Sequence, residues 1–345
     1  MSFSPKFAIL GSGSIGTYIG AHLVKAGYPV VFVGRERLKQ EIQLFGLGIS
    51  DYTGSSFTLA PNQVRYVTDI KEAKDSNIFL ITVKSKDTIE LGKSIRSLFS
   101  LEELSKIIVV SFQNGVRNSQ ELASVLPELG DRNIPGMVPF NVVAKGKGKF
   151  HRGTSGELVL QSNEFGDRIN SYLKGSGLPS MVHKNMEGVL WGKLLFNLNN
   201  SLNALVGIPL REELSQRGFR KILSDMISEG IEILKLSGIK PARAGKMIPW
   251  LAPIILKLPD FLFFTVASSM VKIDPEARSS MWEDLHHGRK TEISYLNGEI
   301  LKLADQIGHK APINRKIVSL VQEAENGSGT VKYSAESLSK ELGMI

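Results

Sequence analysis

Ten residues near the N-terminus constrain the fold of this chain more than any other segment. The apolar run Phe7 to Leu10 leads directly into the turn Gly11-Ser12-Gly13-Ser14-Ile15-Gly16, and a helical spacing of apolar residues follows. A strand, a glycine turn and a helix in this order can bind a dinucleotide pyrophosphate, because the first N–H groups of the helix face the anion. The sequence therefore predicts nucleotide binding, and a purely structural glycine turn is the alternative.

The alternation of strand and helix continues beyond this turn. Continuous apolar runs at 30–33, 77–83 and 107–112 each end in polar residues or glycine. Such runs are typical of parallel strands that are buried on both faces and carry ligand-binding loops at their carboxyl ends. The segment 136–162 has the pattern of antiparallel strands that close this part of the chain. Residues 1–185 are therefore predicted to form a Rossmann-type doubly wound α/β domain that binds the cofactor.

Helical spacing replaces this pattern from about residue 186. Helices are predicted at 190–205, 219–236, 279–285, 292–307 and 314–325, with a broken apolar region at 243–272 and a loose or helical tail after 326–329. Because a chain of 345 residues favours two domains, residues 186–345 are predicted to form an all-α substrate and catalytic domain, with the active cleft between the domains.

The apolar stretch 247–266 in this helical part requires an explanation of its own. Prolines and charged residues interrupt it, which favours broken helices on a core or a pocket wall over a membrane span. An apolar face of the helical domain is compatible with either a homodimer interface or core packing.

Composition narrows the classes of partner and chemistry. The net charge is +8, but the basic residues are scattered among acids, so a phosphorylated cofactor and an anionic substrate account for it better than a nucleic acid. The absence of cysteine excludes disulfides, thiolate nucleophiles and zinc–sulfur sites. No metal site is predicted, because the adjacent His286 and His287 point to different sides of a helix. No signal peptide is recognised, so a cytoplasmic location is expected.

The end of the second predicted strand indicates which nicotinamide cofactor binds. An Asp or Glu there accepts a bond from the ribose of NAD, whereas a small residue followed by Arg meets the 2′-phosphate of NADP. Gly34-Arg35 fits NADP, and Arg37 could add a second cation. Glu36 is a contrary sign if it points inward, and a solvated charged turn is the alternative.

Two polar clusters in the helical part could carry chemistry. Lys193, Asn197 and Ser201 are spaced to share one helix face, amid several asparagines that favour helices poorly. A lysine there could be a cation for a carboxylate or a general acid for a carbonyl oxygen, and an exposed surface side chain is the alternative. Downstream, Ser279-Ser280 could hold an anion or cap a helix, and Glu292, placed early in a helix, could tune a lysine or interact with the helix dipole.

Taken together, these motifs resemble the ketopantoate reductase (2-dehydropantoate 2-reductase) family over nearly the whole chain. The resemblance rests on the glycine turn, Arg35, Val83-Lys84, Gln113-Asn114-Gly115, Trp191-x-Lys193 with Asn197, Ser279-Ser280-Met281, and Thr291-Glu292-Ile293 before Leu296-Asn297-Gly298. It implies NADPH-dependent reduction of a 2-oxo acid to a 2-hydroxy acid, as in pantothenate biosynthesis. The small-molecule substrate is expected to be ketopantoate.

The resemblance also implies roles for individual residues. Lys193 would be the general acid, assisted by Glu292, which would also contact the cofactor. The glycine turn 11–16 and Arg35 would bind NADP(H), and Lys84 and Asn114 would line its nicotinamide side. The substrate would be held by Asn114, Lys193, Asn197, Ser201 and Ser280.

Two departures from the family pattern bear on the substrate. Ser201 stands where a second asparagine is common, and the apolar region 247–272 is longer than expected. A reductase of another 2-oxo acid or of a larger carbonyl compound is therefore an alternative, and a non-enzymatic NADP-binding sensor is a second one.

Overall fold

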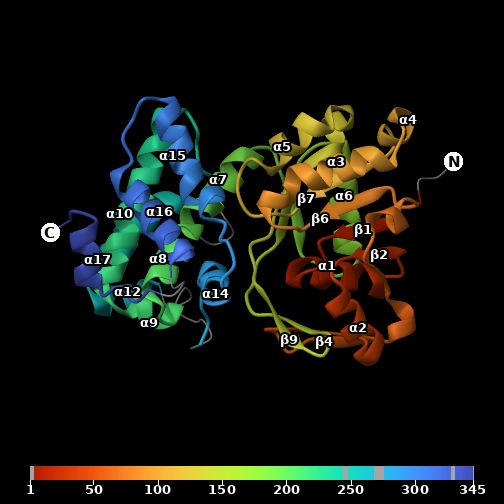
Figure 1. Cartoon of the computed structure of the whole chain (residues 1–345), viewed down its shortest axis with the longest axis horizontal. Coiled ribbons are helices and arrows are strands. Elements are labelled where there is room, and N and C mark those ends of the chain that lie inside the picture. The colour runs from red at the N-terminus through yellow and green to blue at the C-terminus, as the bar shows by residue number, and fades with distance from the viewer. Residues whose placement is uncertain (1–3, 244–247, 268–275, 328–330, 345) are drawn as a thin grey trace. The chain divides into compact units, whose positions relative to one another are not determined.

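A computed structural model describes residues 4–243, 248–267, 276–327 and 331–344 (Figure 1). The chain divides into two compact units, Met1–Met186 and Glu187–Ile345. The first unit is mixed α/β, and the described part of the second is helical. The predicted fold class, a Rossmann-type sheet followed by a helical domain, is confirmed.

Eight strands of the first unit form one sheet, in the order β12-β11-β8-β7-β6-β1-β2-β5. Their bounds are β1 Phe7–Leu10, β2 Val30–Val33, β5 Arg65–Val67, β6 Ile78–Ile81, β7 Ile108–Ser111, β8 Asn133–Met137, β11 Leu158–Gln161 and β12 Ser180–His183. Neighbouring strands are parallel except β8 and β11. Because β1 lies between β2 and β6, the strand order reverses there, and in open α/β sheets ligands bind at the carboxyl edge of this reversal.

Both faces of the large sheet are covered, which explains the continuous apolar runs in its strands. Phe7 and Ile9 belong to one buried cluster, while Ala8 and Leu10, whose side chains point the other way, belong to another. Helices α1 (Ser14–Lys25) and α6 (Glu164–Gly175) contribute to the first cluster, and α3 (Thr88–Leu98), α4 (Leu101–Leu104) and α5 (Asn118–Val125) to the second. Figure 1 shows α3 and α5 on the opposite side of the strands from α1.

A second, four-stranded sheet in the order β4-β3-β10-β9 corrects one prediction. The segment 136–162 does contain antiparallel pairs, but it divides between two sheets: β9 (Val142–Gly146) and β10 (Lys149–Arg152) join the small sheet, and β11 joins the large one. The partners of the hairpin are β3 (Leu47–Asp51) and β4 (Ser56–Leu59), which the sequence did not predict. Both strands are short and only partly buried, so their apolar pattern is weak.

Short elements complete the first unit. These are α2 Glu36–Phe45 and the 3₁₀ turns η1 Pro61–Gln63, η2 Ile70–Ala73, η3 Ser85–Asp87 and η4 Pro127–Arg132.

The second unit consists of helices packed around the long helix α10. The elements are α7 Met186–Asn197, α8 Asn199–Val206, α9 Leu210–Ser215, α10 Arg217–Leu236, η5 Pro249–Leu251, α11 Ala252–Lys257, α12 Asp260–Val266, α14 Ser280–His286, η6 Ile293–Tyr295, α15 Asn297–Gln306, α16 Pro312–Asn326 and α17 Ala335–Glu341. Helix α10 contacts α9, α11, α15, α16 and α17. No helix in the described ranges is long and apolar enough to cross a membrane.

Two predicted helices are interrupted. The helix predicted at 190–205 is divided at Leu198 into α7 and α8, consistent with the low helix propensity of the surrounding asparagines. The helix predicted at 292–307 begins as α15 only at Asn297, because Leu296 is not helical. Glu292 therefore precedes a 3₁₀ turn, and its predicted place early in an α-helix is wrong.

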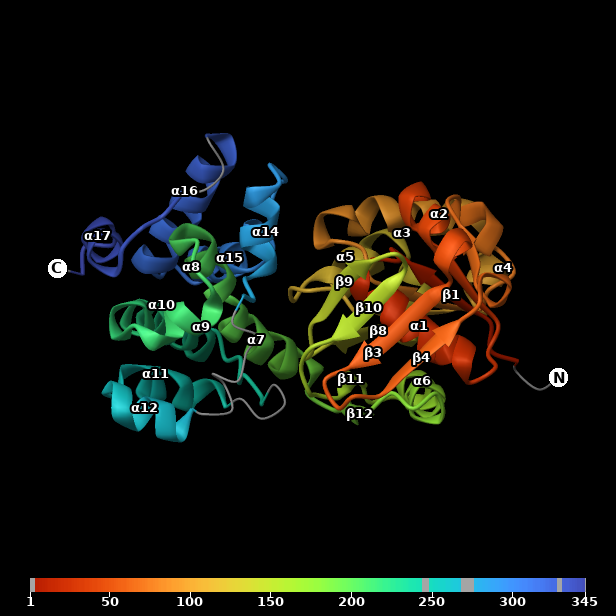
Figure 2. The ribbon, with the colours of Figure 1, turned by 90° about the horizontal axis from the view of Figure 1, so that it is seen from below.

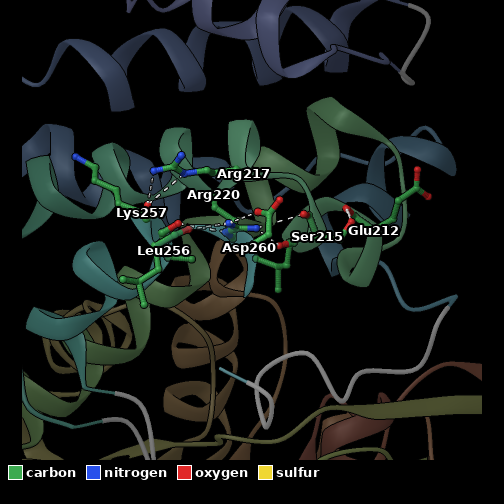
Figure 3. Close-up of polar contacts among 9 residues, drawn as sticks. Glu212, Ser215, Arg217, Arg220, Leu256, Lys257 and Asp260 are labelled. Carbon is green, nitrogen blue, oxygen red and sulfur yellow. Dashed lines mark hydrogen bonds and ion pairs between the residues drawn. The ribbon is translucent and has the colours of Figure 1, made fainter. Parts of the chain in front are cut away.

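The broken apolar region predicted at 243–272 lies partly outside the described residues, at 244–247 and 268–272. Its described part forms η5, α11 and α12, and α11 packs against α10. Arg220 of α10 holds these elements together: its fully buried guanidinium donates to the carbonyls of Leu214, Ser215, Leu256 and Leu258 and to the carboxylate of Asp260 (Figure 3). The outer side of the segment leaves Trp250, Ile254, Phe261 and Val266 more than half exposed.

Candidate functional site

The predicted glycine turn lies at the carboxyl end of β1, where the strand order of the sheet reverses. A side chain at Gly11, whose φ is +89°, would lie 2.6 Å from the backbone nitrogen of Val83, and one at Gly16 would lie 2.3 Å from the hydroxyl of Thr82. Glycine is therefore required at both positions for the turn to approach β6. Nothing lies within 3.9 Å of a side chain built on Gly13, so the backbone there is open to a ligand.

Hydrogen bonds fasten this turn to the neighbouring strands. The N–H and the hydroxyl of the buried Ser12 both donate to the carbonyl of Val33 in β2, and the hydroxyl of Thr82 donates to the carbonyl of Gly11. Helix α1 begins directly afterwards, with Ser14, Ile15 and Gly16 in its first turn. The N–H groups of a first helical turn have no acceptor within the helix and favour an anion. The turn is thus a fixed cradle suited to a pyrophosphate.

Arg35, the cation predicted to bind the 2′-phosphate of NADP, follows the end of β2. Arg35 is exposed at the start of α2, and Arg37 is exposed beside it. The contrary residue, Glu36, is also exposed and is engaged along its own helix by Lys39 and Gln40. A side chain at Gly34 would lie 2.1 Å from the hydroxyl of Tyr66, so the small residue before Arg35 makes room for this tyrosine.

The loops that follow β6 and β7 are joined to each other, which brings Lys84 and Asn114 to one part of the sheet edge. The hydroxyl of Ser85 donates to the carbonyl of Asn114 at 2.6 Å, and the side chain of Asn118 donates to the same carbonyl. Thr88 connects the two loops again through Ser85 and Asn118. Both Lys84 and Asn114 are half-buried.

In the second unit, the structure brings together Lys193 of α7 and Glu292, which are far apart in the sequence. Part of the side chain of Lys193 is accessible to solvent, but protein atoms surround it closely. Burial lowers the pKa of Lys193 to about 8, and the charge of Glu292 opposes this by raising it. A lysine with such a pKa exchanges its proton close to neutral pH, as a general acid must.

The backbone on either side of Glu292 is held by a residue that the sequence did not single out. The carboxylate of Glu325 in α16 accepts hydrogen bonds from both the N–H and the hydroxyl of Thr291, and the N–H of Ile293 donates to that hydroxyl. Lys290 also pairs with Glu325. Thr291 and Glu325 therefore fix the chain at Glu292 from both sides.

The remaining predicted substrate residues have different surroundings. Asn197 is half-buried one helical turn after Lys193 on α7, and Ser280 is exposed in the first turn of α14. Ser201 is fully buried on α8, and its hydroxyl donates to the carbonyl of Leu198 in the same segment. Ser279 accepts a bond from the N–H of Trp282 and so caps α14, which is the structural alternative considered for it.

One buried acid beside this region was missed by the sequence analysis. Glu213 is fully buried on α9, and burial raises its pKa to about 8. Its position was readable in one respect: Leu210, Glu213 and Leu214 have the spacing of a single buried helix face.

Both halves of the chain match models of one protein family. Residues 7–164 match the family model described as ketopantoate reductase PanE/ApbA, and residues 185–325 match the one for its C terminal. The 2-dehydropantoate 2-reductase of Pyrococcus horikoshii is 27% identical over 95% of this chain and 100% of its own. That of Archaeoglobus fulgidus is 25% identical over 93% of this chain and 98% of its own.

Solved structures extend the likeness to the fold. A ketopantoate reductase from Ralstonia eutropha is 25% identical, with a TM-score of 0.78 over 94% of this chain and 99% of its own. A D-mandelate dehydrogenase, solved with NADH and anilino(oxo)acetate, is 19% identical, with a TM-score of 0.75 over 94% of this chain and 100% of its own. The second likeness concerns the fold alone.

Proposed function

This chain belongs to the ketopantoate reductase family, and from that premise we propose that it reduces 2-dehydropantoate (ketopantoate) to pantoate with NADPH. The observation that carries the proposal is Lys193, whose pKa is lowered to about 8 beside Glu292. The glycine cradle of the first unit fits a dinucleotide, because Gly11 and Gly16 allow the tight turn and Gly13 leaves the backbone open. The most direct test is oxidation of NADPH, followed by absorbance, on addition of ketopantoate.

The chemistry assigns a separate task to each group. NADPH, when bound, supplies a hydride to the carbonyl carbon of the 2-oxo acid. The carbonyl oxygen takes up the electron pair of the broken π bond, and the ammonium of Lys193 gives it a proton, so that a 2-hydroxy acid results. Asn197 and Ser280 are proposed to hold the substrate, with Ser280 on its carboxylate. Ser201 is fully buried and its hydroxyl is bonded to the carbonyl of Leu198, so no substrate contact is proposed for it. Lys84 and Asn114 are proposed to line the nicotinamide side, and Asn114 also to contact the substrate.

The preference for NADP over NAD is proposed to depend on Arg35. In Arg35→Ala, the KM for NADPH is expected to rise about 10- to 100-fold, because a charge-assisted bond to the 2′-phosphate is lost, while the KM for NADH changes little. Steady-state kinetics with both cofactors measure this. Arg65→Ala is the matched control, since its guanidinium donates to the carbonyl of Glu72. Equal effects of Arg35→Ala on the two cofactors would contradict the assignment.

The proton of Lys193 is expected to make the reduction dependent on pH. Because the pKa of Lys193 is about 8, the donor is protonated below this pH and is lost as the pH rises through it. We expect kcat/KM to fall about tenfold per pH unit on the alkaline side. In Glu292→Gln the carboxylate charge that raises this pKa is removed, so the fall is expected to begin at lower pH. Identical pH profiles for the two enzymes would contradict the coupling.

A different 2-oxo acid is the second candidate substrate. The buried hydroxyl of Ser201 is bonded to the carbonyl of Leu198, so this position offers less to the polar groups of ketopantoate than an asparagine would. Turnover across a panel of aliphatic and aromatic 2-oxo acids distinguishes the candidates. A strong preference for ketopantoate supports ketopantoate as the substrate, and a preference for another acid supports the second candidate. Tight NADPH binding with no oxidation by any oxo acid would support the sensor alternative.

A further inference from the structure

Hydrogen bonds through Asn203 connect the buried acid Glu213 with the start of α14. Its Oε2 accepts a hydrogen bond of 2.7 Å from the side-chain amide of Asn203, and the amide of Asn199 also interacts with the carboxyl. Both asparagines lie on α8, and the proposed reaction assigns no role to either of them. The side chains of Glu213 and Asn203 are fully buried, so this contact is part of the interior.

The same asparagine, Asn203, is also hydrogen-bonded to the residue before α14. Its amide nitrogen donates to Glu213 and to the carbonyl of Ile208, while its Oδ1 accepts the N–H of Ser279 at 2.8 Å. Both N–H donors and the oxygen of the amide are therefore used. The reverse orientation would place N–H groups against the N–H of Ser279 and oxygen against Glu213, so the carboxyl helps to fix which way the amide points.

Ser279 in turn fixes the first turn of α14. Its hydroxyl donates to the carbonyl of Asn200 and accepts the N–H of Trp282. The next residue is Ser280, whose hydroxyl is proposed above to meet the carboxylate of the substrate.

We propose that Glu213 is a positioning residue for substrate binding: through Asn203 and Ser279 it places Ser280 against the carboxylate of the 2-oxo acid. This inference depends on the proposed function, because it needs Ser280 to contact the substrate. It assigns Glu213 no contact with the reacting atoms.

The surroundings of Glu213 also indicate its charge state. Burial raises its pKa to about 8, and the amides of Asn203 and Asn199 oppose this only in part. Within the described structure, Oε1 of Glu213 and Oδ1 of Asn199 are buried and make no hydrogen bond. A proton on Oε1 makes the group neutral and supplies a donor, so at neutral pH Glu213 acts as a carboxylic acid. Glutamine has the same shape and also provides a donor beside an acceptor.

The test compares three substitutions at this position with one control. Glu213→Gln is expected to keep the wild-type KM for ketopantoate. Glu213→Asp withdraws the carboxyl from Asn203, and Glu213→Ala removes it. Both are expected to raise the KM for ketopantoate roughly tenfold or more, while the KM for NADPH stays within about twofold. Glu229→Gln is the control, because this glutamate accepts bonds from the N–H groups of Ile313 and Asn314 at the start of α16.

Thermal unfolding of each variant separates positioning from general stability. A loss of stability in Glu229→Gln without a change in the KM for ketopantoate shows that destabilisation alone does not move this constant. An unchanged KM for ketopantoate in Glu213→Asp and Glu213→Ala overturns the inference, as does the same result in Glu213→Asp alone where Glu213→Ala does not fold. A wild-type enzyme that turns over no 2-oxo acid refutes instead the proposed function.

Discussion

Lys193→Ala is expected to lower the turnover of ketopantoate by about 10²- to 10⁴-fold, the usual contribution of a placed general acid. The physical reason is that hydride arrival leaves negative charge on the carbonyl oxygen, and the ammonium of Lys193 both stabilises this charge and protonates it. The surroundings of Lys193 favour this role over that of a surface cation, because burial has already lowered its pKa to about 8. Single-turnover and steady-state kinetics with NADPH measure the loss.

Controls for this variant come from the same unit. Lys302 pairs with Glu299 across one turn of α15, and its removal in Lys302→Ala is expected to leave turnover unchanged. Binding of NADPH to Lys193→Ala, followed by fluorescence, is expected to match the wild type, since the lost group acts on the substrate oxygen. Turnover of Lys193→Ala within about threefold of the wild type would remove this lysine from the chemistry.

The first unit shows how far local sequence patterns reach. The β1–turn–α1 segment was predictable because each part depends on neighbours in the sequence: continuous apolar residues make a buried strand, and glycines permit the turn. The small sheet was not, because β3 pairs with β10, about a hundred residues later, and neither strand has a strong pattern. Its existence depends on tertiary pairing.

In the candidate site, too, some residues could be predicted from the sequence and others only from the tertiary structure. Lys193 and Glu292 could be chosen from the sequence by residue type and resemblance, but their electrostatic contact needs the fold of the second unit. Glu325, which holds Thr291, and Glu213, which holds Asn203, have no local signal of their role. An isolated glutamate in a helix is most often exposed, so its partners become visible only once distant helices are placed together.

The second large effect is expected for Arg220, whose side chain is fully buried. Its bonds join α10 to α9 and to the α11–α12 segment, and Figure 2 shows these helices next to one another in the second unit. Arg220→Met is expected to lower the free energy of unfolding by roughly 3–5 kcal/mol, because each buried acceptor that is left without a donor costs about 1–3 kcal/mol. Four backbone carbonyls and Asp260 would lose their donor, and the stacking of the guanidinium on Phe263, at 4.2 Å, would be lost. Chemical denaturation measures the change.

Two matched variants show why the burial of Arg220 matters more than its charge. Arg217 is exposed and donates to the carbonyl of Lys257, so Arg217→Met is expected to cost less than about 1 kcal/mol. Asp260→Asn keeps the oxygen acceptor for Arg220 and leaves the four carbonyl bonds in place, so a small loss is expected there too. If Arg220→Met were no less stable than Arg217→Met, methionine packing would compensate for the lost bonds, and the apolar segment would need another anchor. The expected order follows because water can satisfy the groups around Arg217, whereas the bonds from Arg220 to the carbonyls of Leu214 and Leu256 are buried.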